Sequence, residues 1–536
     1  MDSIKNKHKR SPLKFIRSPI TLLILLLSLM GSYFHHPILF SNESCRYFLI
    51  MAVVDHHKLN VDDITTDAND DISFHNGHYY SAKAIGVPLL GIPVYWFIRN
   101  FTPLSETHPL SPMNIYIVRF FVTTLPFILL GVIMFNFSIR MGTDTANSIC
   151  MVLAYSFGSI ALHHALMFSG HQTAASFCFF SFALIFWLKF RTNKNQTFNA
   201  LYAFIAGLFA GIGALSDYTA MYIAIMLTLY VFSTGIPLNN KMLFILGGIP
   251  CVTLLAFYNL HCFGSPLSFS YNYLSYESFR QGVEKGFLGI SLPRLNAVFA
   301  ILFSPSRGFF FIMPIFLYSL FGLFRMFKEK KYLSEAIVII LIFLGYICIN
   351  GGFYGWHGGW TYGPRYLVPM LPFLAVPIAF APLRSIWFAL LCFISIFQVI
   401  LSAAIYIHVP NEIVNPLFEI IIPFLFDGFT AINIGNLLGL KDPLSFLPLL
   451  VLLIIFTTLL FNKTGLPNKG HESFLHKLSS AILALFIVMS LSLQSTQPEK
   501  DVHCWKAYLL KIAYNTNSLK KGIGPLLYED KKCNSK

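Results

Sequence analysis

The polar stretch 41–114 carries side chains suited to group-transfer chemistry. It begins SNESCRYF and later reads GHYYSAKAIG. Asn42 is a good helix N-cap, which puts Glu43 in the first turn, where a carboxylate is favoured. There Glu43 can act as a general base toward a hydroxyl, and Lys83 can hold a phosphate. The structural alternatives are a capping turn for Glu43 and a snorkelling side chain for Lys83.

A second stretch, INGGFYGWHGGWTYGPRYLVP at 349–369, is rich in Gly, Trp and Tyr and contains His357 and Arg365. Aromatic rings stack on sugars and collect at membrane interfaces, and glycine allows close approach of the backbone. A guanidinium that opens an apolar run, as in Arg307 and Arg365, can hold a phosphate bidentately. The structural alternative is an aromatic belt with snorkelling arginines. Asp217, between two apolar runs, is either functional or a helix cap.

The elements that carry these side chains have to be membrane helices. The chain has 536 residues, of which 55% are hydrophobic and 12% charged, and its mean hydropathy is +0.64. A soluble domain carries about 25% charged residues, so these values exclude a soluble globular enzyme, a disordered chain and a disulfide scaffold. We predict an all-α polytopic membrane protein. The net charge of +14 then reports orientation in the membrane rather than binding of nucleic acid.

About thirteen apolar runs predict transmembrane helices. They lie near 20–40, 115–138, 145–167, 172–188, 199–216, 218–234, 242–262, 309–327, 334–350, 366–382, 385–407, 446–462 and 476–494. The run 85–98 is short for a span and holds two prolines, so we predict a re-entrant or interfacial segment there. The large first outer loop therefore carries interfacial helices.

The basic residues predict which side of the membrane each loop faces. With 85–98 not spanning, the N-terminus and the short loops on its side hold 19 of the 38 Lys and Arg and 5 of the 24 acids. The positive-inside rule makes that side cytoplasmic. If 85–98 spans instead, the basic loops 189–198 and 325–335 face outward.

The predicted organisation follows from this orientation. It comprises a cytoplasmic basic N-terminus 1–19, a transmembrane core 20–462 with outer loops 41–114, 263–308 and 351–365, a cytoplasmic loop and last helix 463–494, and an extracytoplasmic tail 495–536. Cys504 and Cys533 in that tail either pair or stay free.

Several motifs in this order resemble a known superfamily. They are N-E-x-x-R-Y after the first span, G-H-Y-Y-S-x-K-x-x-G, F-G-S-P-L, S-P-S-R-G and a late G-G-W-x-Y-G-P-R-Y. Together they resemble the bacterial branch of the integral-membrane GT-C glycosyltransferases, whose relatives include the protein O-mannosyltransferases and the lipid A aminoarabinose transferase. The resemblance covers about 20–462.

The resemblance implies a sugar donor carried on polyprenyl phosphate and an inverting displacement on the extracytoplasmic face. The implied base is Glu43, with Asp67, Asp70 or Asp71 as alternatives, and the catalytic pair we predict is Glu43 and Asp71. The residues predicted to bind substrate or phosphate are Arg46, His78, Tyr80, Lys83, Arg307, His357, Trp360, Tyr362 and Arg365. No metal ligand is assigned, and a divalent metal stays open.

The implied partners are the polyprenyl-phosphate-linked sugar, the membrane, and a lipid, glycan or protein acceptor of the cell envelope such as lipopolysaccharide. The implied location is a bacterial inner membrane, and no nucleic acid is expected. A secondary transporter or a lipid or glycolipid flippase is the alternative, and a scaffold without catalysis is a third. Transporters place charges within their spans, whereas the spans here are nearly free of charge apart from Arg119.

Overall fold

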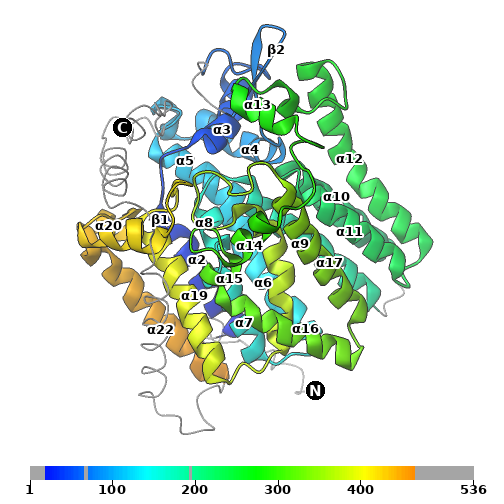
Figure 1. Ribbon diagram of the computed structural model, residues 1–536, viewed down its shortest axis with the longest axis vertical. Helices are drawn as coiled ribbons and strands as arrows, with labels where there is room; N and C mark the ends of the chain where they lie inside the picture. Colours follow the sequence, from blue (N-terminus) through cyan, green and yellow to red (C-terminus); the bar gives the residue numbers. More distant parts are fainter. Residues whose placement is uncertain (1–17, 66–70, 192–195, 465–536) are drawn as a thin grey trace, which may run out of the picture.

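The computed structural model describes residues 18–65, 71–191 and 196–464, and nearly all of its regular structure is helical (Figure 1). Within these residues, seven helices are long and apolar enough to cross a membrane, judged by length and composition. They are Pro112–Arg140, α9 (Gly170–Lys189), α10 (Gln196–Ser216), α12 (Leu238–Phe263), α17 (Leu333–Gly352), α19 (Ile386–Ile405) and Pro443–Leu460, most of which is α22 (Leu447–Thr464). The predicted fold class, an all-α multi-pass membrane protein, is confirmed.

These seven helices coincide with seven of the predicted apolar runs, and five other runs form shorter or interrupted helices. Two of the five are single helices, α2 (Pro19–Tyr33) and α11 (Ala220–Ser233). The other three are divided, into α7 (Thr145–Phe157) and α8 (Ala161–Leu166), into α15 (Phe309–Ile312) and α16 (Leu317–Glu329), and into 3-10 turns around α18 (Leu371–Ala375). The predicted run 476–494 lies outside the described residues.

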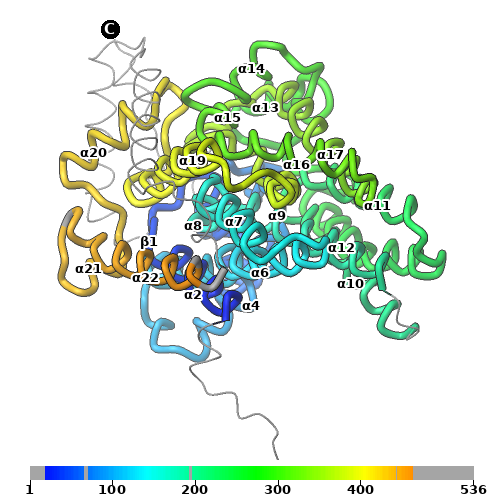
Figure 2. Tube along the Cα trace, turned by 90° about the horizontal axis from the view of Figure 1, so that it is seen from below, coloured from blue at the N-terminus to red at the C-terminus, as the bar shows by residue number. Residues whose placement is uncertain are grey.

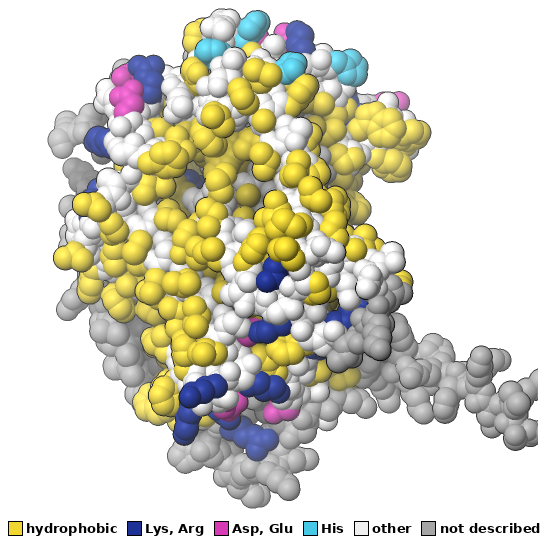
Figure 3. Space-filling view, turned by 90° about the vertical axis from the view of Figure 1, so that its right-hand side faces the viewer, with side chains coloured by type: hydrophobic (Ala, Val, Ile, Leu, Met, Phe, Trp, Pro, Cys, Tyr) yellow, Lys and Arg dark blue, Asp and Glu magenta, His cyan; other side chains and the backbone are white. Residues whose placement is uncertain are grey.

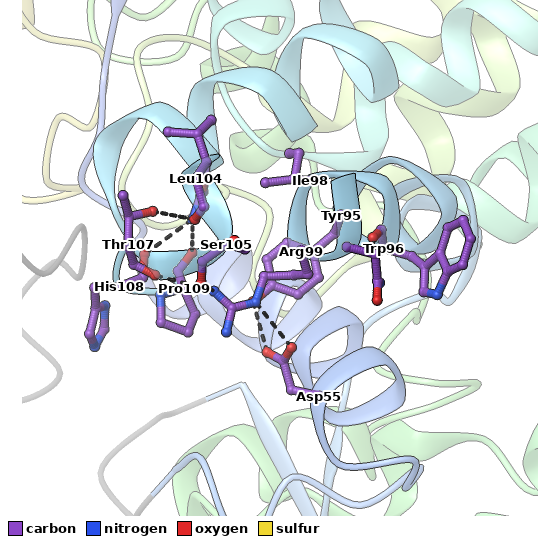
Figure 4. Close-up of polar contacts among 12 residues, drawn as sticks. Asp55, Tyr95, Trp96, Ile98, Arg99, Leu104, Ser105, Thr107, His108 and Pro109 are labelled. Carbon is purple, nitrogen blue, oxygen red and sulfur yellow. Dashed lines mark hydrogen bonds and ion pairs between the residues drawn. The ribbon is translucent and has the colours of Figure 1, made fainter. Parts of the chain in front are cut away.

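The short run with two prolines forms α4 (Gly86–Phe101), which packs along α3 (Ser41–Asp55) and α5 (Pro112–Arg119) and is not among the candidate spans. A polar cluster fixes it there (Figure 4). Asp55 accepts from the Tyr95 hydroxyl at 2.8 Å and from Arg99 Nε at 3.3 Å. The same guanidinium donates to the carbonyl of Ser105 at 2.6 Å. The C-terminal end of α3 is thereby joined to α4 and to the turn that follows it.

The basic connections gather at one end of the helices. Lys189, at the end of α9, pairs with the fully buried Glu335 at 2.8 Å. Tyr332, before α17, has ring contacts with Phe190 and with Phe380. The described parts of the segments that were predicted to lie on one side, 189–191, 325–335 and the turn before α19, therefore meet there.

The predicted outer segments meet at the opposite end of the helices. The two ends are about 30 Å apart, since α17 has 20 residues and a helix rises 1.5 Å per residue. Short bridges join Ser73 to Leu274 and Ile290 to Phe353, and the amide of Thr361 donates to the carbonyl of Val409 at 2.8 Å. The hairpin of β2 (Ile72–His75) and β3 (His78–Ser81) also lies at this end (Figure 1). Its turn, Asn76-Gly77, has positive φ at both residues, as a tight hairpin requires.

Hydrophobic side chains cover much of the face shown in Figure 3, and charged side chains and histidines gather toward its two ends. On α12 the exposed apolar residues include Leu246, Ile249, Val252 and Phe257. By contrast, α9 is the most enclosed candidate span, with 83% of its apolar window buried, and it runs among α6 (Leu125–Arg140), α10 and α11 (Figure 2). This central helix begins at the end where the outer segments meet, and the candidate site lies there.

Candidate active site

A small pocket lies where α3, the start of α9 and the loop 353–364 come together. Its lining residues are Phe40, Asn42, Glu43, His164, Met167, Ser169, His171, Trp360, Arg365 and His408. Glu43, Trp360 and Arg365 are therefore brought together from distant parts of the sequence. Five of the lining residues have ionisable side chains, and these come from several segments of the chain, so the fold and not local sequence assembles the site.

Glu43 is 3% exposed, and its carboxylate accepts three hydrogen bonds. Oε1 accepts from the amide of Phe168 at 3.1 Å, and Oε2 accepts from the amide of Phe40 at 3.2 Å and faces His408 Nε2 at 3.1 Å. The bond to Phe40 caps α3, so the N-cap is Phe40 and the prediction of Asn42 as the cap is wrong. The side chain of Glu43 therefore both caps α3 and lines the pocket.

Lys83 and Asp71 form an ion pair, with Nζ and Oδ1 2.5 Å apart and both side chains largely buried, and Asp71 acts electrostatically on the lining residue Arg365. Lys83 also lies over the ring of Tyr271. Burial opposes the charge of Lys83, yet Asp71 and Tyr271 hold its pKa above the usual value. Lys83 is therefore a permanent cation at neutral pH. Asp71 is the partner of this cation and does not line the pocket.

Two other cations lie closer to the pocket. Arg46, one helical turn after Asn42, donates to the side chain and the carbonyl of Asn42. A Cβ on Gly170 would stand 3.6 Å from its guanidinium. Arg365 donates to the Tyr366 hydroxyl at 3.4 Å. The Nε atoms of both arginines are buried and have no hydrogen-bond partner among the described residues.

Arg307 holds the loop 353–364 in place and does not line the pocket. Its guanidinium donates to the carbonyls of His357 at 2.7 Å and Gly359 at 2.9 Å. His357 Nδ1 accepts from the amide of Gly359 at 3.0 Å. Burial, with Arg307 and Arg365 nearby, lowers the pKa of His357 to about 4, so its ring is neutral at neutral pH.

The remaining predicted residues also lie outside the pocket lining. Tyr362 is 2% exposed and contacts the ring of His163. Tyr80 is buried against Phe263. His78 is half exposed and pairs with Asp62 at 2.7 Å. The alternatives Asp67 and Asp70 lie outside the described residues.

Three lining histidines, His164, His171 and His408, were not predicted from the sequence. His171 Nδ1 lies 2.5 Å from Asp217 Oδ2, and both residues are buried. Asp217 Oδ1 accepts from the amide and the hydroxyl of Thr219 at 3.0 and 2.9 Å, so the predicted capping role is present as well. Although burial opposes its charge, the His171 ring and these donors keep the pKa of Asp217 below the usual value.

A signal for this pair was present in the sequence. The chain carries histidines at three positions between 163 and 171, just before or within an apolar run, and an acid at the end of another run. Their pairing could not be predicted, because it depends on how α9 packs on α10. Among the residues that the structure describes, no group of three His, Cys, Asp or Glu side chains is placed to hold a metal ion.

No protein-family model matches the sequence, and no curated protein matches it. Among solved structures, the chain is similar to the oligosaccharyltransferase of Archaeoglobus fulgidus in its apo form, with 12% identity and a TM-score of 0.36. The similarity covers 94% of this chain and 58% of that one, so this chain spans less than two thirds of that enzyme. The likeness decides nothing about the site, whose chemistry has to come from its own side chains.

Proposed function

We propose that the protein is a glycosyltransferase that moves a sugar from a polyprenyl-phosphate carrier to a hydroxyl or amine of a cell-envelope lipid, glycan or protein. One observation carries the proposal. A single pocket at one end of an apolar helix bundle joins a carboxylate, a guanidinium and an indole, from Glu43, Arg365 and Trp360. Two further cations, Arg46 and Lys83, lie beside it.

The cations are suited to a lipid phosphate at the bilayer surface. Lys83 is offset by Asp71, whereas neither Arg46 nor Arg365 has an acidic partner at salt-bridge distance among the described residues. A phosphate bound there would find free Nε–H donors on both arginines, and its departure with the bonding electrons would be stabilised by the same charges. No nucleotide is then required, because the lipid phosphate is the leaving group.

The indole of Trp360 is suited to the sugar, and the carboxylate of Glu43 is suited to the nucleophile of the acceptor. Trp360 presents an aromatic surface on which a sugar ring can stack. Glu43 has a carboxylate that can accept a hydrogen bond from the acceptor nucleophile. Attack from the side opposite the phosphate inverts the anomeric centre.

Reconstituted transfer tests the proposal. The purified full chain in lipid vesicles would be given a panel of radiolabelled undecaprenyl phosphoryl sugars and, as acceptor, envelope membranes from a strain lacking the chain. We expect transfer of one panel sugar into the envelope fraction and saturable binding of undecaprenyl phosphate. Neither transfer nor binding across the panel would overturn the proposal, and transport of the intact lipid would favour the flippase.

We further propose that the pocket end faces outward across a bacterial inner membrane and that the N-terminus is cytoplasmic. The basic connections at the other end support this orientation through the positive-inside rule. Cysteines introduced at the exposed Leu292 and Lys331 distinguish the two ends. An impermeant maleimide should label Leu292→Cys in intact cells and Lys331→Cys only after permeabilisation, beyond the labelling of the unmodified chain. The reverse pattern would invert the orientation.

A further inference from the structure

The pocket contains two carboxylate–histidine pairs of opposite arrangement. In one pair the carboxylate of Glu43 faces the pocket and already accepts from Phe168, Phe40 and His408. A carboxylate has about four acceptor positions, so about one remains. In the other pair the carboxylate of Asp217 lies behind and the ring of His171 lines the pocket.

The second ring nitrogen of His171 is not hydrogen-bonded within the part of the chain that the structure describes. Its Nδ1 lies 2.5 Å from Asp217, while Nε2 is buried and without a hydrogen-bond partner among the described residues. Because Asp217 is held by the amide and hydroxyl of Thr219, it fixes both the ring orientation and the tautomer, with the proton on Nδ1. The Nε2 lone pair is then directed at a ligand rather than at the protein. A buried nitrogen left unpaired destabilises the folded state, and a ligand donor would remove that cost.

We propose that His171, held by Asp217, is the proton acceptor for the nucleophile of the acceptor, and that Glu43 orients that nucleophile. This proposal rests on the glycosyltransferase function proposed above. The hydroxyl or amine of the acceptor donates to Nε2, and its proton passes to that nitrogen as the new bond to the anomeric carbon forms. The bond from that carbon to the phosphate breaks, and its electron pair leaves with the lipid phosphate. The resulting imidazolium is paired with Asp217.

The charged and titratable groups around His171 come from every element that faces it. They are Asp217 at the end of α10, His164 and Tyr366 with rings 5.2 and 5.7 Å away, and the cations Arg46 and Arg365. Asp217 favours the imidazolium, and the two arginines oppose it; the carboxylate of Glu43 lines the same pocket. The bound lipid phosphate would offset those arginines, so proton transfer to His171 becomes easier when the donor is present.

The experiment compares the full chain with His171→Gln, His171→Ala, Asp217→Asn and a matched control, His163→Gln. His163 is a buried histidine on α8 whose Nε2 already contacts the carbonyl of Val399 and the hydroxyl of Ser402. It does not line the pocket. Asp217→Asn preserves the shape of the site but lets the side-chain amide donate to Nδ1, which moves the proton to Nε2 and removes the lone pair.

Each variant is assayed for sugar transfer across a range of pH and for binding of undecaprenyl phosphate. We expect His171→Gln and Asp217→Asn to lose about 10²–10⁴-fold in transfer rate with phosphate binding retained. The acidic limb of the pH profile should disappear in His171→Gln. Added imidazole should restore part of the activity of His171→Ala, because it supplies the missing base. His163→Gln should behave like the unmodified chain.

Two results overturn the proposal while the glycosyltransferase function stands. One is transfer by His171→Gln at the unmodified rate with an unchanged pH profile. The other is parallel loss of transfer and phosphate binding without imidazole rescue, which assigns the pair to the stability of the fold. A third result, no transfer and no phosphate binding by the unmodified chain, overturns the function and the proposal together.

Discussion

The two ends of α3 each carry a buried or half-buried acid in a polar cluster, and the two clusters differ in how completely they are hydrogen-bonded. At the C-terminal end, Asp55 takes the donors of Tyr95 and Arg99, and Arg99 also donates to backbone carbonyls (Figure 4). At the N-terminal end, several nitrogens in or beside the pocket have no hydrogen-bond partner among the residues that the structure describes. These are Arg46 Nε, Arg365 Nε, His164 Nε2 and His171 Nε2.

The difference separates a cluster that stabilises the fold from one that is prepared for a ligand. Buried polar atoms in folded proteins are nearly always paired, and each unpaired one costs about 1–3 kcal/mol. Four unpaired nitrogens around one pocket destabilise the folded state, and folding alone does not explain why they are left without partners. The Asp55 cluster shows that the same helix can support a fully bonded arrangement. We therefore expect substitutions at the Glu43 end to affect activity and those at the Asp55 end to affect stability.

The largest effect expected from a substitution on α3 is the loss of sugar transfer in Glu43→Gln. Glutamine at this helix position can still cap the amide of Phe40, so protein level and thermal stability should change little. The carboxylate that orients the nucleophile is lost, and a misplaced reacting group costs about 10²-fold in rate. Single-turnover transfer rates measure this. Asp55→Asn is the control and should stay within a few-fold of the unmodified rate, and equal losses in both variants would erase the contrast between the two ends.

The second effect, on donor affinity, tests the cations beside the pocket. Lys83→Ala removes a charge-assisted contact to phosphate worth about 1.5–3 kcal/mol, or about 10–150-fold in the dissociation constant of undecaprenyl phosphate. The acceptor KM should change much less. Lys189→Ala is the matched control, because its ion pair with Glu335 lies at the other end of the helices. An unchanged donor affinity in Lys83→Ala would remove Lys83 from the phosphate site.

Asp71→Asn tests whether Asp71 is only the ion-pair partner of Lys83 or takes part in catalysis. If Asp71 serves only as the partner of Lys83, its neutralisation frees the lysine, and undecaprenyl phosphate should bind equally well or more tightly. If Asp71 takes part in catalysis, as the sequence predicted, transfer falls while binding is retained. The ratio of donor affinity to transfer rate in this one variant decides between the two roles.

The fold class was predictable from the sequence, while the internal structure of several helices was not. Long apolar runs with few charges predicted the seven candidate spans. The short length and two prolines of the run 85–98 set it apart from these spans, and this run forms α4. The run 366–382 was predicted as one span, but Pro369, Pro372 and Pro377 remove backbone donors and turn much of it into 3-10 helix. The hydropathy of this segment predicts that it is buried, which the structure confirms, but it does not predict the type of helix.

The candidate site was predictable only where local sequence carries the signal. Glu43, Trp360 and Arg365 stand in motifs with unusual composition, and they meet in the pocket. His171 and Asp217 are 46 residues apart, and although both stand next to apolar runs, only the packing of α9 on α10 brings them together. Conversely, Arg307 resembles a phosphate ligand in sequence, yet its donors are taken by loop carbonyls. Sequence identifies side chains capable of chemistry, and tertiary structure determines which of them are left unpaired.

The third effect is on stability at the Asp55 end. Asp55→Asn weakens the charge-assisted bond to Arg99, which is largely buried, and should lower the free energy of unfolding by about 1–2 kcal/mol. The fraction of protein that stays monodisperse after heating measures this loss. Arg99→Gln should produce a similar loss, and the double variant should lose less than the sum, because the two residues form one contact. Full additivity would mean that the pair does not act as a unit.

The smallest effect distinguishes two tryptophans near the same membrane end. Trp360 lines the pocket and has ring contact with Phe40, whereas Trp96 is half exposed on α4 and points away from its polar cluster (Figure 4). An aromatic contact is worth about 0.5–1.5 kcal/mol, so Trp360→Leu should weaken binding of the sugar-bearing donor by about 2–12-fold. Binding of undecaprenyl phosphate, which has no sugar, should stay the same. Trp96→Leu should change neither. If Trp360→Leu weakened both ligands equally, the indole would contact the lipid or the loop instead of the sugar, and the pocket would have to hold the donor in another orientation.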